Sequence, residues 1–203
     1  STIKTCAQFM QTRSDLPADI VVKFAKNINE AAKLINDIID RTLNSAKSSS
    51  SLFLFEIVHT EGFIHQLINQ ATETYNVKNI ELQLGELHPV YGEKTLLYQL
   101  FMNLINNAIN LRSKRETTSL EIYSEIQKNR VAYFIKDNGI GIDESEKKHV
   151  FSIFRRLSNA SEYEGTGVGM SIVKRIVDRL NAEISFESTL GAGTTFKISF
   201  PNE

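Results

Sequence analysis

The sequence has few of the features that mark secreted, membrane or nucleic-acid-binding proteins. Cys6 is the only cysteine among 203 residues, which excludes an internal disulfide and suits a reducing compartment. A formal net charge of −1 gives no general attraction to nucleic acid or to acidic membranes. Strongly apolar stretches such as LFLF at 52–55 are far too short to span a membrane, and no signal-peptide pattern is found. We therefore expect a cytoplasmic portion of a longer protein, without membrane contact.

Glycine and proline are also missing from a long segment after Pro17, which predicts a helix from there to about Asn44. A short amphipathic helix over 1–12 precedes it, so we expect a helical hairpin over 1–48. The long helix has apolar or small residues at steps of three and four, namely Val21, Phe24, Ile28, Ala31, Ile35 and Ile38. This stripe favours a homodimer in which two hairpins form a four-helix bundle. Packing against the second domain of the same chain is the alternative.

The segment SAKSSSS at 45–51 has the composition of a linker and leads to a second domain at 49–203. Strands and helices are mixed in that domain. The patterns predict strands at 52–59, 80–84, 119–126, 131–137, 184–188 and 194–200, and helices at 60–75, 93–112 and 170–181. Hairpins beside helices favour an α+β two-layer sandwich over a doubly wound parallel sheet.

Neutral amides gather on one face of the helix predicted at 93–112. Gln99, Asn103, Asn107 and Asn110 follow one another at steps of four, four and three. An amide oxygen is a hard ligand that suits Mg²⁺, and an amide nitrogen donates to phosphate. The same pattern also fits an ordinary solvated helix face.

A carboxylate continues the apolar face of the strand predicted at 131–137. Asp137 follows that strand, in the stretch VAYFIKDNGIGI, and a half-buried carboxylate needs a hydrogen-bond donor. The exocyclic amine of adenine is such a donor, and Gly139 and Gly141 let the backbone approach a flat ring closely. An ordinary Asp-Asn-Gly turn at a strand end is the alternative.

Three glycines lead directly into the helix predicted at 170–181. Gly165, Gly167 and Gly169 alternate with other residues in EGTGVGMSIVKRIV, and free N–H groups at a helix start bind anions. The spacing differs from the GxGxxG of dinucleotide-binding loops and from the GxxxxGK[ST] of P-loops. A flexible glycine loop without function is the alternative.

Together, the stretches NLINNAIN, DNGIGI, VFSIFRRL, GTGVGMSIV and GAGTTF, in this order, resemble the N, G1, F, G2 and G3 boxes of sensor histidine kinases. These kinases share an ATP-binding fold with gyrase, Hsp90 and MutL. The resemblance covers essentially the whole chain, since 1–48 resemble the dimerisation helices and 52–201 the catalytic domain. It implies a two-layer α/β sandwich after the helical hairpin. The segment SNASEYEGTGVG further resembles kinases attached to bacterial phytochromes.

The resemblance implies ATP and Mg²⁺ as cofactors and assigns roles to individual residues. Asn107 would hold Mg²⁺, Asn103 would lie by the phosphates, Asp137 would accept from the adenine amine, and Arg156 would face the γ-phosphate. Residues 143–168 would form a mobile lid. The remaining nucleotide-binding positions that it implies are Asn110, Gly139, Gly141, Ile142, Phe154, Gly165, Thr166, Gly167, Val168, Gly169 and Thr195.

The residue type at position 103 also distinguishes between a kinase and an ATPase. The gyrase-like branch has a glutamate at this position that activates water, and an asparagine cannot act as a base. We therefore expect transfer of the γ-phosphate to a histidine, with Arg156 and Asn103 as catalytic residues and little hydrolysis. The resemblance also implies a response regulator receiver domain and an upstream sensor domain as partners, and no nucleic acid.

Two departures from the family pattern stand out. His59, His65, His88 and His149 all lack the His-Glu/Asp-x-x-x-Pro setting of the phosphoacceptor, so we expect that histidine roughly two turns upstream of Ser1. The hairpin would then be truncated, and the chain unable to phosphorylate itself. Asn110 stands where the family often has lysine. This change favours a second hypothesis, a degenerate ATP-binding scaffold without kinase activity.

Overall fold

The computed structural model describes residues 21–22, 54–112, 117–153, 156–160, 163 and 167–202. The chain divides into two compact units, Ser1–Phe53 and Leu54–Glu203. In the first unit the described residues 21–22 are helical, and the rest of the hairpin predicted at 1–48 lies outside the described residues. The hairpin and its dimer therefore stay predictions.

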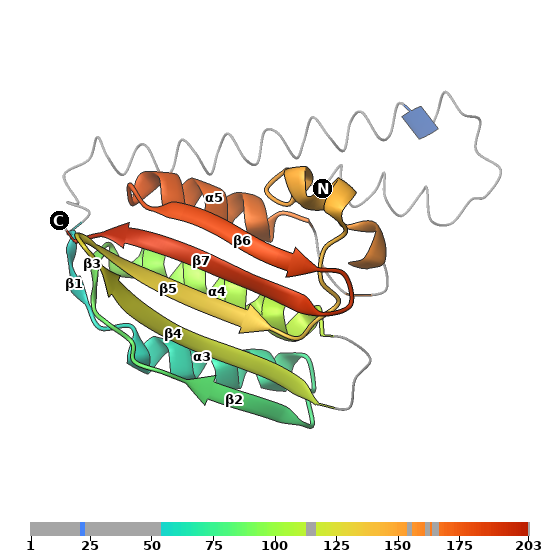
Figure 1. The fold of residues 1–203 in the computed structure, drawn as a ribbon, viewed down its shortest axis with the longest axis horizontal. Helices are drawn as coiled ribbons and strands as arrows, with labels where there is room; N and C mark the ends of the chain where they lie inside the picture. Colours follow the sequence, from blue (N-terminus) through green and yellow to red (C-terminus); the bar gives the residue numbers. More distant parts are fainter. Residues whose placement is uncertain are drawn as a thin grey trace. The chain divides into compact units, whose positions relative to one another are not determined.

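The second unit is an α+β fold whose helices lie on one face of a mixed sheet (Figure 1). The sheet has the order β2-β4-β5-β7-β6, and its members are β2 Ile80–Leu84, β4 Thr118–Gln127, β5 Arg130–Asp137, β7 Gly193–Pro201 and β6 Glu183–Thr189. A separate antiparallel pair joins β1 Glu56–Val58 to β3 Val90–Gly92. The helices are α3 Glu61–Thr74, α4 Lys94–Asn110 and α5 Gly169–Arg179, with short 3₁₀ turns η1 Glu144–His149 and η2 Ser158–Ala160. The predicted fold class is confirmed.

Helix α4 forms the centre of the core. Its predicted apolar stripe is buried, as Leu97, Phe101, Leu104 and Ala108 are each at most 5% exposed. Side chains of β5 point alternately toward the helices and away from them, and Tyr133 and Ile135, on the helix side, are fully buried. This packing fixes the C-terminal end of α4 relative to the C-terminal end of β5.

A polar network is buried beside this apolar core. The Tyr133 hydroxyl donates to the His88 carbonyl oxygen at 2.5 Å and lies 2.6 Å from Thr60 Oγ1. Burial raises the pKa of Tyr133 above its ordinary value, so the hydroxyl stays neutral and available as a donor. The network ties the N-cap residue of α3 to the middle of β5.

The structure differs from the predicted elements in three places. Of the strand predicted at 52–59, residues 52–53 lie outside the described residues, and within 54–59 only β1 is strand, since its partner β3 is also three residues long. The sequence patterns did not predict β3. The pair β2–β4 is parallel, whereas the predicted hairpins β4–β5 and β6–β7 are antiparallel as expected. Among the described helices, none combines the length and the apolar character needed to span a membrane.

Candidate nucleotide-binding site

Asp137 ends β5 with its carboxylate held by two backbone donors. Its Oδ1 accepts from the N–H of Gly139 at 2.8 Å and from the N–H of Thr194 at 3.2 Å. Burial raises the pKa of Asp137 to about 6, and the two backbone hydrogen bonds oppose that rise. The second carboxylate oxygen has no such backbone donor in the described part of the chain. The side chain is thus fixed in position and suited to accept from a ligand.

Thr194 contacts the Asp137 carboxylate, whereas the family resemblance had implied Thr195. Thr194 lies directly opposite Asp137 in the β5–β7 register, and its hydroxyl is 2.8 Å from Ser188 Oγ. Thr195 pairs with Lys136, so alternation puts its side chain on the other face of the sheet. The contact of Thr194 with Asp137 depends on the β5–β7 register, which pairs strands far apart in the sequence and which no local pattern indicated.

The turn after Asp137 packs tightly against other parts of the backbone. Gly141 has a φ of +64°, and a Cβ there would overlap the carbonyl oxygen of Thr189. A Cβ on Gly139 would lie 2.5 Å from the Leu111 carbonyl oxygen. Both glycines are therefore required by the protein's own packing, in addition to any close approach to a base.

The end of α4 adjoins this turn through main-chain hydrogen bonds. Leu111 donates its N–H to the Asn107 carbonyl oxygen at 2.9 Å, and its own carbonyl oxygen accepts from Ile140 at 3.0 Å. The turn after Asp137, the candidate for binding adenine, is thus connected to the last turn of α4, which contains Asn107, the candidate for binding the metal ion. Asn110 is buried at 8% exposure, whereas Asn103 and Asn107 are half-buried.

Asn103 lies between α4 and the start of α5. Its Nδ2 donates to the Gln99 carbonyl oxygen at 2.7 Å, and its Oδ1 lies 3.1 Å from where a Cβ on Gly169 would be. The N-cap residue Val168 gives α5 no side-chain cap, so the first N–H groups of α5 are available for an anion. Two stretches far apart in the sequence therefore meet here, as the resemblance implied.

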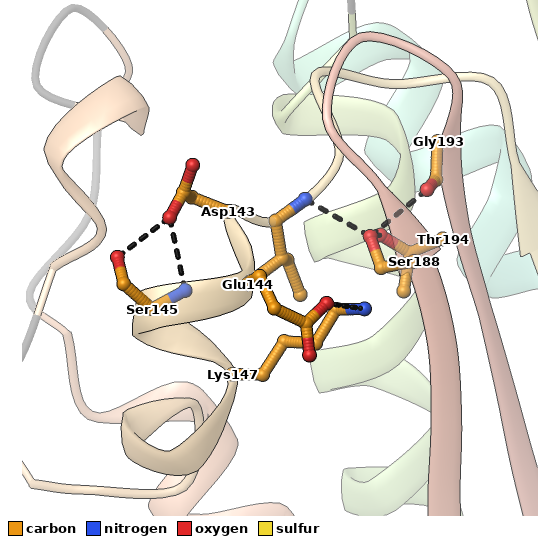
Figure 2. Close-up of polar contacts among 8 residues, drawn as sticks. Asp143, Glu144, Ser145, Lys147, Ser188, Gly193 and Thr194 are labelled. Atoms are coloured by element: carbon orange, nitrogen blue, oxygen red, sulfur yellow. Dashed lines mark hydrogen bonds and ion pairs between the residues drawn. The ribbon is translucent and has the colours of Figure 1, made fainter.

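The described residues of the segment at 143–168 include the two short turns η1 and η2. Asp143 begins η1, where its Oδ1 accepts from the N–H and the hydroxyl of Ser145, and these bonds lower the pKa of Asp143 (Figure 2). The preceding Ile142 donates its N–H to Ser188 Oγ at 2.9 Å, and Ser188 in turn contacts Gly193 and Thr194. Ile142 is therefore joined to the same hairpin that supports Asp137.

Arg156 organises a turn of this segment. Its Nη2 donates to the Ala160 carbonyl oxygen at 2.7 Å and to the carbonyl oxygen of Tyr163. The Tyr163 hydroxyl donates to the Arg112 carbonyl oxygen at 2.6 Å, just beyond α4. Of the other predicted positions, Gly167 and Val168 precede α5, whereas Phe154, Gly165 and Thr166 lie outside the described residues.

Comparison with known proteins agrees with this arrangement. The family model described as "Histidine kinase-, DNA gyrase B-, and HSP90-like ATPase" matches residues 92–203. The chain belongs to this family. The ATPase-family domain thus includes α4, both hairpins, the 143–168 segment and α5.

Relatives of this ATPase-family chain include phytochromes, histidine kinases and sensory kinases. It is 32% identical to cyanobacterial phytochrome A of Nostoc sp. over 191 residues, which are 94% of this chain and 24% of the relative. It is 30% identical to drug sensory protein A of Synechocystis sp. over 213 residues, covering 97% of this chain and 31% of the relative. The chain thus spans about a quarter to a third of the length of these curated relatives.

Solved structures share the fold. The mycobacterial sensor histidine kinase MprB matches with a TM-score of 0.63 at 22% identity, covering 72% of this chain and 97% of that one. Full-length ShkA in complex with AMPPNP matches with a TM-score of 0.62 at 19% identity, covering 93% of this chain and 40% of that one. At these identities the likeness concerns the fold alone.

The residues present fit an adenine nucleotide and its metal ion. Asp137 offers an oriented acceptor for the purine, and the uncapped start of α5 offers N–H donors for phosphate. Among the described residues no group of three His, Cys, Asp or Glu side chains forms a metal site. A magnesium ion here would depend on amide oxygens of α4 and on phosphate oxygens, a combination that Mg²⁺ commonly accepts.

Proposed function

We propose that residues 49–203 are the catalytic domain of a sensor histidine kinase in a two-component system. In this proposal the domain transfers the γ-phosphate of ATP to a histidine outside residues 1–203, from which a response regulator aspartate receives it. The observation that carries the proposal is the connection of Asp137, through Ile140 and Leu111, to the Asn107 turn of α4. Family membership and the histidine and sensory kinases among the relatives support it.

Each residue has a separate task in this mechanism. Bound ATP with Mg²⁺ would supply the phosphoryl group. Asp137 accepts from the adenine amine, while the first N–H groups of α5 bind the phosphates. The amide oxygen of Asn107 holds the metal ion, Asn103 lies by the phosphates, and Arg156 offsets charge on the γ-phosphate. Because Asn103 cannot take a proton from water, hydrolysis is disfavoured relative to transfer.

The proposal is tested first by titrating the chain with ATP, with and without Mg²⁺. We expect saturable binding that Mg²⁺ strengthens, loss of binding in Asp137→Ala, and loss of the Mg²⁺-dependent part alone in Asn107→Ala. Asn129→Ala is a matched control, since this asparagine lies in the β4–β5 turn at the other end of the sheet. Binding that is unaffected by both site variants would refute the assigned site.

A degenerate scaffold without kinase activity is the second candidate, because Asn110 replaces the usual lysine and is buried. The two are separated by incubating the chain, extended by a segment with a phosphoacceptor histidine, with ATP labelled at the γ-phosphate. Acid-labile phosphate on the protein identifies a kinase, and binding without labelling identifies the scaffold. Rapid release of free phosphate would instead indicate a gyrase-like ATPase.

A further inference from the structure

The hydroxyl of Ser188, near the end of β6, uses all of its hydrogen-bonding capacity inside the protein (Figure 2). The side chain is buried, and its Oγ lies 2.9 Å from the Gly193 carbonyl oxygen, 2.9 Å from the Ile142 nitrogen and 2.8 Å from Thr194 Oγ1. Because a carbonyl oxygen only accepts and an N–H only donates, the Ser188 proton goes to Gly193. Thr194 then donates to Ser188, and both acceptor positions of the Ser188 oxygen are occupied.

Ser188 joins two segments, and each of them supplies one donor to the Asp137 carboxylate. Gly139, in the turn that leads to Ile142, donates its N–H to Asp137 Oδ1 at 2.8 Å. Thr194, at the start of β7, donates its N–H to the same oxygen at 3.2 Å. Ser188 bonds to the far end of that turn and to Thr194 itself. The spacing of the two donors, and with it the direction of the second carboxylate oxygen, therefore depends on this hydroxyl.

The same two segments are also joined by main chain alone. The N–H of Gly191 donates to the Ile140 carbonyl oxygen at 2.8 Å, and the β5–β7 register ends with Asp137 opposite Thr194. We therefore expect the segments to stay together when the Ser188 hydroxyl is removed, and their alignment to change.

We propose that Ser188 is a positioning residue for adenine recognition, which acts on the Asp137 carboxylate through Ile142 and Thr194. This inference rests on the proposed function, in which Asp137 accepts from the 6-amino group. Ser188 itself contacts no ligand, since its hydroxyl is already fully used. A hydrogen bond weakens steeply as its angle departs from linear, so a small rotation of the carboxylate reduces recognition of the amine. None of the five stretches that carry the family resemblance includes Ser188.

The test compares two ligands that differ only in the group that Asp137 would bind. Wild type and Ser188→Ala are titrated with ATP and with purine riboside triphosphate, which lacks the 6-amino group. We expect wild type to prefer ATP about tenfold or more, and Ser188→Ala to prefer it only about twofold. If Ser188→Ala weakens both ligands by the same factor, or neither, the preference is unchanged and the inference is wrong.

Ser124→Ala is the matched control for a loss of stability alone. Ser124 is also buried, and its Oγ accepts from the His88 N–H and donates to the Glu86 carbonyl oxygen. It lies opposite Tyr133, away from the Asp137 end of β5. This variant should lower the midpoint of a thermal melt and keep the wild-type preference for ATP. A reduced preference in Ser124→Ala as well would overturn the inference.

A second variant keeps the test open if Ser188→Ala unfolds. Ser188→Cys retains a side chain of similar shape but bonds weakly, so the same titrations should again show a reduced preference for ATP. An unchanged preference in Ser188→Cys would then overturn the inference. Failure of wild type to bind ATP, or equal affinity of wild type for both ligands, would instead overturn the proposed function at Asp137.

Discussion

At the scale of single residues, the buried Asp137 carboxyl destabilises the unliganded protein when it is ionised, and in the proposed site it would accept a hydrogen bond from the ligand. Its pKa in the folded chain is about 6, against an ordinary value of 3.8. A carboxyl with a raised pKa contributes its full stabilisation below the ordinary value, and that contribution is lost as the pH rises through 6. At pH 7 the ionised group therefore costs about 3 kcal/mol of folding free energy.

Asp137→Asn should consequently raise stability while it removes function. The amide oxygen can keep both backbone donors, and no charge is buried, so we expect a gain of about 1–3 kcal/mol at pH 7. Urea unfolding at pH 7 and at pH 4 measures it, and the gain should nearly vanish at pH 4. ATP binding should be lost, because the oxygen that faces the ligand becomes an NH₂ group, so the adenine amine would meet a donor where it needs an acceptor. A variant less stable than wild type at pH 7 would contradict this account.

Nucleotide binding should also release protons near pH 6. A donor from adenine favours the ionised carboxylate and lowers the pKa of Asp137 in the complex. Affinity should then decrease as the pH falls below about 6. Calorimetry in buffers of different ionisation enthalpy gives the number of protons released. Asp137→Asn has no such carboxyl, so any residual binding by that variant should show no such release.

At the scale of elements, replacing two different glycines by alanine should have opposite effects on the stability of the chain. Gly62 lies in α3, where an added Cβ would meet no atom within 4 Å, whereas Gly141 combines a positive φ with a close carbonyl oxygen. Gly62→Ala should stabilise the chain by about 0.5–1 kcal/mol, and Gly141→Ala should destabilise it by more than about 2 kcal/mol. Chemical unfolding of both variants side by side checks this, and equal effects would contradict the described turn.

Tyr133→Phe tests the buried polar network separately from the site. The change leaves Thr60 and the His88 carbonyl oxygen without the Tyr133 hydroxyl, so we expect a loss of about 1–3 kcal/mol. Nucleotide affinity should stay within about twofold, as Tyr133 lies about 13 Å along β5 from Asp137. Denaturant unfolding and ATP titration of the same preparation give both numbers.

The sequence predicts an element well when the residues that determine it lie within one stretch, and poorly when they lie elsewhere in the chain. Helix α4 and the two hairpins follow from periodicity and turn residues within one stretch, and their bounds agree with the prediction within two residues. The short strand β3 and the parallel β2–β4 pair depend on partners elsewhere in the chain, which no local pattern indicates. Thr194 was missed for a related reason, since its role exists only through the β5–β7 register.

At the scale of the whole molecule, the sequence predicts a dimer through the first unit. Its test uses the full chain, whose mass is measured by analytical ultracentrifugation. We expect a dimer for wild type and a monomer for the double variant Ile28→Asp and Ile35→Asp, since charge in the predicted seam prevents helix packing. ATP affinity should be equal in both if 49–203 binds nucleotide independently. A monomeric wild type would support packing against the second domain instead.

The bonds that Leu111 forms with Asn107 and Ile140 use only its peptide group. We therefore expect a substitution scan to find position 111 tolerant, even though the proposed purine-binding and metal-binding residues are connected through it. Proline at 111 or at 140 is the exception, because it deletes the amide hydrogen that such a bond requires. Other substitutions at 111 and 140 should keep both main-chain hydrogen bonds and leave nucleotide affinity nearly unchanged.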